Sequence, residues 1–203
     1  MSLSRLLKRC LFAAAVLVVW PLWLFSWLER RLGLGEEAFL FGAQLLALMP
    51  GLPGAFLRSA YYVGTLERCH WEVRVGFGSI FVKRAASMAR HASMGNYCVI
   101  GNADIGEGVM IGSRVSVPSG KRQHFDESGR LSATVGNFDR VRIGARSWIG
   151  EGAIVLADVG EHSVVGAGAV VVNRVGDRLL VSGNPAQTVR QVEVVSSSVQ
   201  GSA

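Results

Sequence analysis

One polar segment of this chain carries a histidine that could act as a general base. It runs from residue 118 to 130, reads PSGKRQHFDESGR, and contains His124. An imidazole that titrates near neutral pH can accept a hydroxyl proton at working pH. Asp126, two residues later, could orient the ring. The segment therefore predicts acid–base chemistry at His124, although an idle loop histidine would produce the same pattern.

The remaining histidines and the cysteines predict no further chemistry. We expect His70, His91 and His162 to be solvated or structural, with His162 at an outward-facing repeat position. The four histidines are too dispersed to assemble a three-histidine zinc site by spacing alone. The three cysteines are scattered, which excludes a metal-binding spacing and a disulfide framework and favours a reducing compartment weakly.

The second half of the chain must position the histidine segment, and it repeats with a period of six. This period fits neither a helix nor plain strand alternation, and it is typical of a solenoid in which each hexad is a short strand plus a turn. The histidine segment interrupts the repeats, and a long excursion from a regular solenoid is more often functional than accidental. The recurring hydrophobic residues, often followed by glycine, are Val82, Met88, Met94, Ile100, Ile105, Ile111 and Val117, then Ile143, Ile149, Val155, Val159, Val165 and Val171.

These repeats resemble the hexapeptide-repeat acyltransferases, over roughly residues 75–190. The segments that carry the resemblance are 105–112 (IGEGVMIG), 147–150 (SWIG), 164–171 (VVGAGAVV) and 182–186 (SGNPA). The resemblance implies an all-β solenoid, a left-handed parallel β-helix of triangular cross-section. It also implies a homotrimer with active sites between adjacent solenoids, acetyl-CoA as co-substrate, and a loop histidine that deprotonates the acceptor hydroxyl. His124 matches that role.

The resemblance further implies which residues contact the substrates. Relatives usually carry Thr-Lys where Val172 and Asn173 stand here, so Arg174 is the expected substitute for a missing phosphate-binding lysine. Trp148 matches a tryptophan beside the active-site tunnel, with packing between coils as the alternative. Asn96 lies roughly where some relatives bind the acceptor, with a turn asparagine as the alternative. The expected cofactor-binding residues are Trp148, Ala167, Val172, Asn173, Arg174, Gln187 and Arg190, and the expected substrate-binding residues are Asn96, Asp126 and Trp148.

The N-terminal region is expected to attach to a membrane. Residues 11–28 carry no charge and nearly reach the roughly 20 residues that a helix needs to cross the hydrocarbon. Basic residues flank both ends, and no small-x-small cleavage site follows, which argues against a cleaved signal peptide. A second apolar stretch at 38–57 is interrupted by prolines that break a helix. It could complete a helical hairpin, re-enter the inner leaflet, lie at the interface, or cap the first coil.

These features predict a membrane-associated helical region at 1–64, a solenoid at 65–192, which the resemblance implies is a left-handed β-helix, and a disordered tail at 193–203. The predicted function is acetyl-CoA-dependent O-acetylation of a saccharide, in surface polysaccharide or lipid-linked glycan biosynthesis, at the cytoplasmic face of the inner membrane. N-acetyltransfer to an amino sugar and a non-catalytic membrane scaffold are the alternatives. The net charge of +6 suits an anionic cofactor or lipid, and no nucleic-acid partner is expected because no nucleic-acid motif accompanies it.

Overall fold

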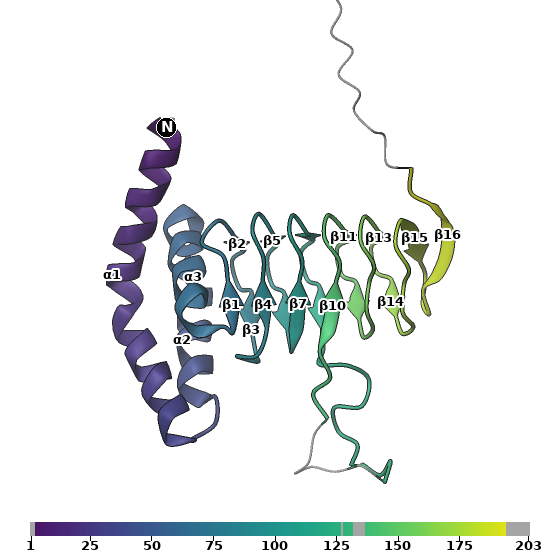
Figure 1. The fold of residues 1–203 in the computed structure, drawn as a ribbon, viewed down its shortest axis with the longest axis horizontal. Helices are drawn as coiled ribbons and strands as arrows, with labels where there is room; N and C mark the ends of the chain where they lie inside the picture. The colour runs from purple at the N-terminus through teal and green to yellow at the C-terminus, as the bar shows by residue number, and fades with distance from the viewer. Residues whose placement is uncertain (1–2, 127, 132–136, 194–203) are drawn as a thin grey trace, which may run out of the picture.

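The computed structural model describes residues 3–126, 128–131 and 137–193, and shows a row of stacked coils with helices at one end (Figure 1). The coils wind about six times, and their strands lie on three faces. The polar segment with the histidine leaves the stack on one side. The prediction of an all-β solenoid behind a helical N-terminal region is confirmed, and attachment to a membrane stays a prediction. Residues 194–203 of the predicted tail lie outside the described residues.

The strands form three sheets in which neighbours are parallel, except for the last pair of sheet B. The chain passes from sheet A to B to C in each coil, so the solenoid has an A–B, a B–C and a C–A corner. Sheet A is β1 (Arg68–Cys69), β4 (Ser87–Met88), β7 (Ala103–Ile105) and β10 (Val141–Ile143), continued by bridges at Val159 and Val175. Sheet B is β2 (Arg74–Val75), β5 (Ser93–Met94), β8 (Met110–Ile111), β11 (Trp148–Ile149), β13 (Val164–Val165), β15 (Leu179–Ser182) and β16 (Gln187–Gln191). Sheet C is β3 (Ile80–Phe81), β6 (Val99–Ile100), β9 (Ser116–Val117), β12 (Ile154–Val155) and β14 (Val170–Val171).

A ladder of buried side chains fills the interior of the solenoid. Every recurring position predicted from Met88 to Val171 is buried. The first predicted position, Val82, is wrong by one residue: Phe81 is fully buried and Val82 is half-buried. The reason is that β3 ends at Phe81 and Val82 already belongs to the bend that leads into the next coil.

Glycine follows many ladder residues because the next coil passes close by. A Cβ atom at Gly150 would lie 2.5 Å from the backbone nitrogen of Ala167, and one at Gly144 would lie 2.5 Å from that of Glu161. Coils stacked at the strand spacing of about 4.8 Å leave no room for a side chain at these points. The close approach of two coils, rather than turn geometry, therefore requires glycine there.

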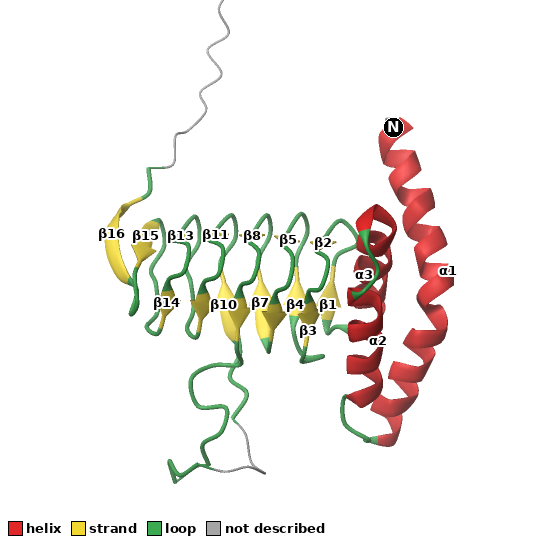
Figure 2. Ribbon diagram, turned by 180° about the vertical axis from the view of Figure 1, so that it is seen from behind, coloured by secondary structure: helices red, strands yellow, loops and turns green. Residues whose placement is uncertain are grey.

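Three helices cover the open end of the first coil (Figure 2). They are α1 (Leu3–Leu32), α2 (Glu37–Ala47) and α3 (Gly51–Thr65). The predicted break in the second apolar stretch is confirmed, because α2 ends before the proline segment and α3 begins within it. Tyr62 of α3 packs edge-on against Phe81, with ring centroids 4.9 Å apart, and its hydroxyl accepts a hydrogen bond from the Phe81 N–H at 3.1 Å. Helices α2 and α3 therefore cap the first coil, which was one of the alternatives that the sequence left open.

Candidate active site at the excursion

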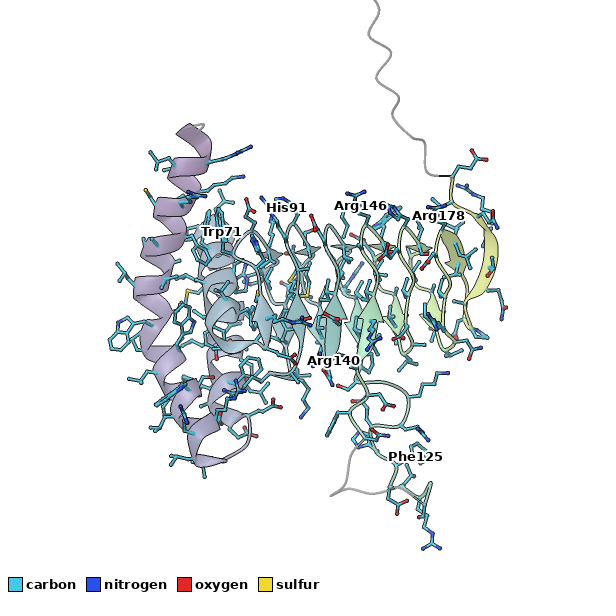
Figure 3. All side chains as sticks on the ribbon, viewed as in Figure 1. Trp71, His91, Phe125, Arg140, Arg146 and Arg178 are labelled. Atoms are coloured by element: carbon cyan, nitrogen blue, oxygen red, sulfur yellow. The ribbon has the colours of Figure 1, made fainter. Side chains whose placement is uncertain are left out.

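The histidine segment forms an excursion, residues 118–140, that leaves the C–A corner between β9 and β10. Its outgoing limb begins at Pro118 and its return limb ends at Arg140, and both limbs are hydrogen-bonded to Asn102 where they join the coils. The Asn102 N–H donates to Ser119 Oγ at 2.8 Å, and the Asn102 side-chain amide donates to the Phe138 carbonyl at 2.9 Å. The prediction that the repeats stop after Val117 and resume near Ile143 is confirmed. The excursion is thus anchored on the rigid stack, while Figure 3 shows Phe125 in its outer part, well away from the coils.

His124 is exposed on the outer part of this excursion. Among the described residues, no hydrogen bond or ion pair engages its imidazole. Asp126 forms no hydrogen bond with the His124 imidazole in the described part of the chain. Its Oδ1 instead accepts hydrogen bonds from Ser128 Oγ at 2.7 Å and from the Arg130 N–H at 2.9 Å. The Ser128 hydroxyl, followed by the Arg130 N–H, holds the pKa of the Asp126 carboxyl below its usual range. The structure thus gives Asp126 a role in closing a local turn, and an orienting role toward His124 stays a prediction.

The outgoing limb of the excursion reaches the residues expected to hold cofactor phosphates. Lys121 Nζ donates to Asn173 Oδ1 at 3.3 Å. Arg174 follows at the same corner and is exposed, and no hydrogen bond or ion pair of the described residues engages its guanidinium. We call these three residues, Lys121, Asn173 and Arg174, the cationic corner. Two exposed cations and an amide fit a phosphate group, because both cations keep donors to offer.

The return limb is held by Arg140, a residue that the sequence did not single out. Its guanidinium forms an ion pair with Glu67 and donates to the Ala85 carbonyl at 2.7 Å. Just before it, Phe138 lies under the Lys83 ammonium, 4.2 Å from the ring centroid. The pKa of Glu67 is lowered chiefly by its hydrogen bond from Arg140. These partners lie 55–73 residues from the limb that they hold, so no local spacing could have indicated them.

Trp148 and Arg190 lie in one row on the outer face of sheet B. Trp148 pairs with Val164, Val164 with Leu180, and Leu180 with Arg190. Three strand spacings separate the ends of this row by roughly 14 Å. The Trp148 side chain is 51% exposed, so the alternative of packing between coils does not hold. Gln187 lies on the same last strand, opposite Ser182.

The other expected contact residues lie at two corners. Ala167 is exposed in the turn of the B–C corner, and Val172 is half-buried where the chain enters the C–A corner. Asn96 also lies at the B–C corner, where its Oδ1 accepts from the Phe77 N–H at 2.9 Å and joins the first two coils. The structure therefore supports the turn interpretation of Asn96, and an acceptor contact there stays a prediction.

Within one chain most of the expected site residues fall into two groups, while Asn96 and Ala167 lie apart from both at the B–C corner. Sheet B carries Trp148 and Arg190, and the C–A corner carries the excursion and the cationic corner. In a solenoid of three faces, the C–A corner lies opposite sheet B. The two groups can therefore meet only if the C–A corner of one copy faces sheet B of another.

The other histidines lie away from both groups. His91 and His162 occupy the A–B corner with left-handed backbone, at φ of 60° and 54°, in the row of turn positions that also holds Arg146 and Arg178 (Figure 3). Among the described residues, no three histidine, cysteine or acidic side chains cluster as a metal site would require. A shallow groove of about 920 Å³ runs along sheet A, and of the expected site residues only Arg174 lines it.

Solved structures of acetyltransferases share this fold. A hexapeptide-repeat-containing acetyltransferase from Vibrio cholerae matches with a TM-score of 0.58 at 20% identity, over 75% of this chain and 88% of that chain. A galactoside acetyltransferase in complex with coenzyme A matches with a TM-score of 0.57 at 17% identity, over 76% and 80%. This chain has the hexapeptide-repeat acetyltransferase fold.

A sugar-modifying enzyme also shares this fold. A maltose O-acetyltransferase from Clostridium difficile 630 matches with a TM-score of 0.56 at 20% identity, over 79% of this chain and 88% of that chain. No protein-family model and no curated protein matches the sequence. At these identities, the hexapeptide-repeat acetyltransferase fold is what the solved structures share with this chain.

Proposed function

We propose that this protein is an acetyl-CoA-dependent O-acetyltransferase that acts on a saccharide hydroxyl. One observation carries the proposal: on a hexapeptide-repeat fold, the excursion that bears His124 is joined to the cationic corner by the Lys121–Asn173 hydrogen bond. A proton acceptor and a phosphate-binding group thereby belong to one structural unit. A galactoside acetyltransferase of this fold was solved with coenzyme A, which supports an acyl-CoA donor.

In the proposed reaction, His124 accepts the proton of the acceptor hydroxyl as that oxygen attacks the thioester carbonyl carbon. A backbone N–H stabilises the oxyanion that develops on the carbonyl oxygen. The C–S bond then breaks, and the His124 imidazolium returns its proton to the departing thiolate. The products are an acetyl ester and free coenzyme A, so His124 ends the cycle neutral.

We further propose that the complete site forms between copies in a homotrimer. The two groups of expected site residues lie on opposite sides of one solenoid, so only a second copy can bring sheet B to the excursion. Exposed apolar side chains on the outer faces of sheets B and C offer surface for such packing: Met110 is 54% exposed and Val99 is 44% exposed. Burying them against a neighbour would be favourable, because apolar surface leaves water.

The proposed acceptor is a saccharide of a surface polysaccharide or a lipid-linked glycan, and the proposed location is the cytoplasmic face of the inner membrane. Helix α1 supports membrane attachment, because residues 5–32 are long and apolar enough to cross a bilayer by length and composition. An acceptor tethered to the same membrane would be held near the enzyme.

The test is release of free thiol from acetyl-CoA by the full chain, with soluble and lipid-linked saccharides as acceptors. The proposal expects acceptor-dependent thiol release and a product whose acetyl group is lost in mild base, as an ester is. An acetyl group that survives mild base would instead show N-acetyltransfer. Calorimetric titration with coenzyme A separates the scaffold alternative, because a non-catalytic scaffold should not bind it.

A further inference from the structure

The helical cap carries an apolar surface that none of the residues in the described ranges covers. On α1, the side chains at Leu17, Leu24 and Leu28 are 74%, 51% and 46% exposed. Their spacing of seven and four residues places them on one helical face. The opposite face, with Ala15, Val19 and Ser26, is buried against the rest of the protein. Further exposed apolar residues of α1 are Leu6, Leu7, Leu11, Val18, Trp20, Phe25, Trp27 and Leu32.

Helix α1 is fastened to the solenoid near both of its ends. Toward its N-terminus, Phe12 packs edge-on against Trp71 of the first coil, with ring centroids 5.9 Å apart. Near its C-terminus, Glu29 forms a buried ion pair with Arg84, whose guanidinium also donates to the Ser26 carbonyl at 2.7 Å. From residue 12 to residue 29 an α-helix extends roughly 25 Å. The helix therefore lies across the end of the coil stack for most of its length, as Figures 1 and 3 show.

This arrangement conflicts with a membrane-spanning orientation of α1. Helices α2 and α3 pack between α1 and the first coil, and α1 meets the coils at Trp71 and Arg84. If residues 11–28 crossed the hydrocarbon, α2, α3 and the adjoining edge of the coil stack would enter it too. The first coil carries the exposed Arg74 and Glu72, which forms an ion pair with Arg90 of the second coil. Charged groups at such depth are costly. An orientation with α1 in the plane of the interface immerses only its apolar face.

The charges of α1 indicate what covers this face. Arg5, Lys8 and Arg9 lie near its beginning, and Arg30 and Arg31 lie in its last turn. Its one acidic residue, Glu29, is already paired with Arg84. Cations at both ends of an apolar helix suit an anionic bilayer, whose phosphates lie at the level of the flanking side chains. They disfavour a second copy of the same face, because ten cations would be brought together.

We propose that α1 is an in-plane anchor, which seats its apolar face in the interface of an anionic bilayer while the solenoid points away from the membrane. The N-terminus and the solenoid then lie on the same side of the bilayer. This geometry stands on the helical cap alone and does not depend on the transfer reaction.

The first experiment is co-sedimentation of the full chain with vesicles of neutral phosphatidylcholine, with or without anionic phosphatidylglycerol. We expect stronger binding to the anionic vesicles. The double variant Leu17→Glu and Leu24→Glu should bind the anionic vesicles about a hundredfold more weakly than the natural chain. Each substitution removes the burial of one leucine side chain in the bilayer. Val189→Glu is the matched control, since Val189 is 59% exposed on β16 at the far end of the stack, and it should bind as the natural chain does.

The second experiment distinguishes an in-plane from a spanning helix. In a Cys10→Ser background, the substitution Ser4→Cys reports on the N-terminus and Glu151→Cys reports on the solenoid. Each variant is first bound to the outside of sealed vesicles. A membrane-impermeant maleimide should label both. Protection of the cysteine at residue 4 would overturn the proposal, as would undiminished binding by the double variant. Absence of binding to either vesicle, or equal binding to both, would overturn it as well.

Discussion

Lys121 Nζ lies 3.3 Å from Asn173 Oδ1, and this contact joins the excursion to a later coil. The two residues are 52 positions apart in the sequence. The resemblance to the hexapeptide-repeat acyltransferases implies a lysine where Asn173 stands. Here the ammonium group arrives from the excursion instead and occupies the same corner. The cation that the repeat sequence lacks is thus restored through the fold, beside the Arg174 that the sequence had indicated as its substitute.

Replacement of Lys121 should therefore weaken acetyl-CoA binding. We expect Lys121→Ala to raise the KM for acetyl-CoA roughly 10–100-fold, because a hydrogen bond to a charged group contributes about 1.5–3 kcal/mol. The kcat should change little, and Lys121→Arg should restore most of the affinity. Steady-state kinetics with acetyl-CoA as the varied substrate measures this. The neighbouring Arg122→Ala serves as control, and an unchanged KM in Lys121→Ala would remove Lys121 from the binding site.

His124 should carry the proton transfer. We expect His124→Ala to lower kcat by roughly 10²–10⁴-fold, the usual contribution of a positioned acid–base group. Affinity for coenzyme A and thermal stability should survive, because His124 is exposed and outside the coil stack. His162→Asn is the control: it keeps a residue type that tolerates the left-handed backbone at φ 54°. Near-normal turnover by His124→Ala would rule out this mechanism.

The fold could be predicted from the sequence because one repeated interaction builds it. Each hexad places its recurring hydrophobic side chain in the interior, and the pattern survives from Met88 to Val171. It failed at Val82, where the choice between two adjacent hydrophobic residues depends on where the strand ends. The contacts that hold the excursion were beyond prediction, because Lys121–Asn173 and Arg140–Glu67 join residues that no repeat relates. The orientation of α1 across the coil stack depends likewise on Glu29 and Arg84, which are 55 residues apart.

The buried pair of Glu29 and Arg84 should dominate the attachment of α1. Their side chains are only 6% and 10% exposed. Removing one partner of a buried ion pair leaves an uncompensated charge and costs about 3–5 kcal/mol. We expect Glu29→Ala to lower the free energy of unfolding by that order, measured by chemical denaturation in detergent. Exposed Glu37→Ala, at the start of α2, is the control, and a comparable loss there would show that the effect is not specific to the pair.

The cysteines should differ in reactivity according to their burial. Burial raises the pKa of the Cys69 thiol to about 12 and raises that of Cys98 as well, so both remain protonated and unreactive at neutral pH. Cys10 is exposed on α1. We expect one thiol to react with a colorimetric disulfide reagent in the native protein and three in denaturant. Cys10→Ser should abolish the native reaction, and a second reactive thiol would show that the coil around Cys69 or Cys98 opens.

The ion pair of Glu67 and Arg140 should make the hold on the excursion depend on pH. The Arg140 guanidinium lowers the folded-state pKa of Glu67, so the carboxylate form is favoured in the native protein. The stabilisation is fully present above the pKa of an unfolded glutamate, about 4.3, and is lost as the pH falls through the lower folded-state value. Glu67→Gln should therefore be less stable than the natural chain at pH 7 and equal to it in acid.

The same pair should control how readily the excursion is cut. Arg140→Met removes the guanidinium and frees the return limb, so chymotrypsin should cleave at Phe138 faster at pH 7, where the natural chain is protected. Glu107→Gln is the matched control, because Glu107 is an exposed acid on the neighbouring coil that forms no ion pair among the described residues. Equal cleavage of the natural chain and Arg140→Met would mean that Asn102 and Lys83 hold the limb without Arg140. Faster cleavage together with a lower kcat and an unchanged KM for acetyl-CoA would instead show that Arg140 positions the His124 excursion for proton transfer.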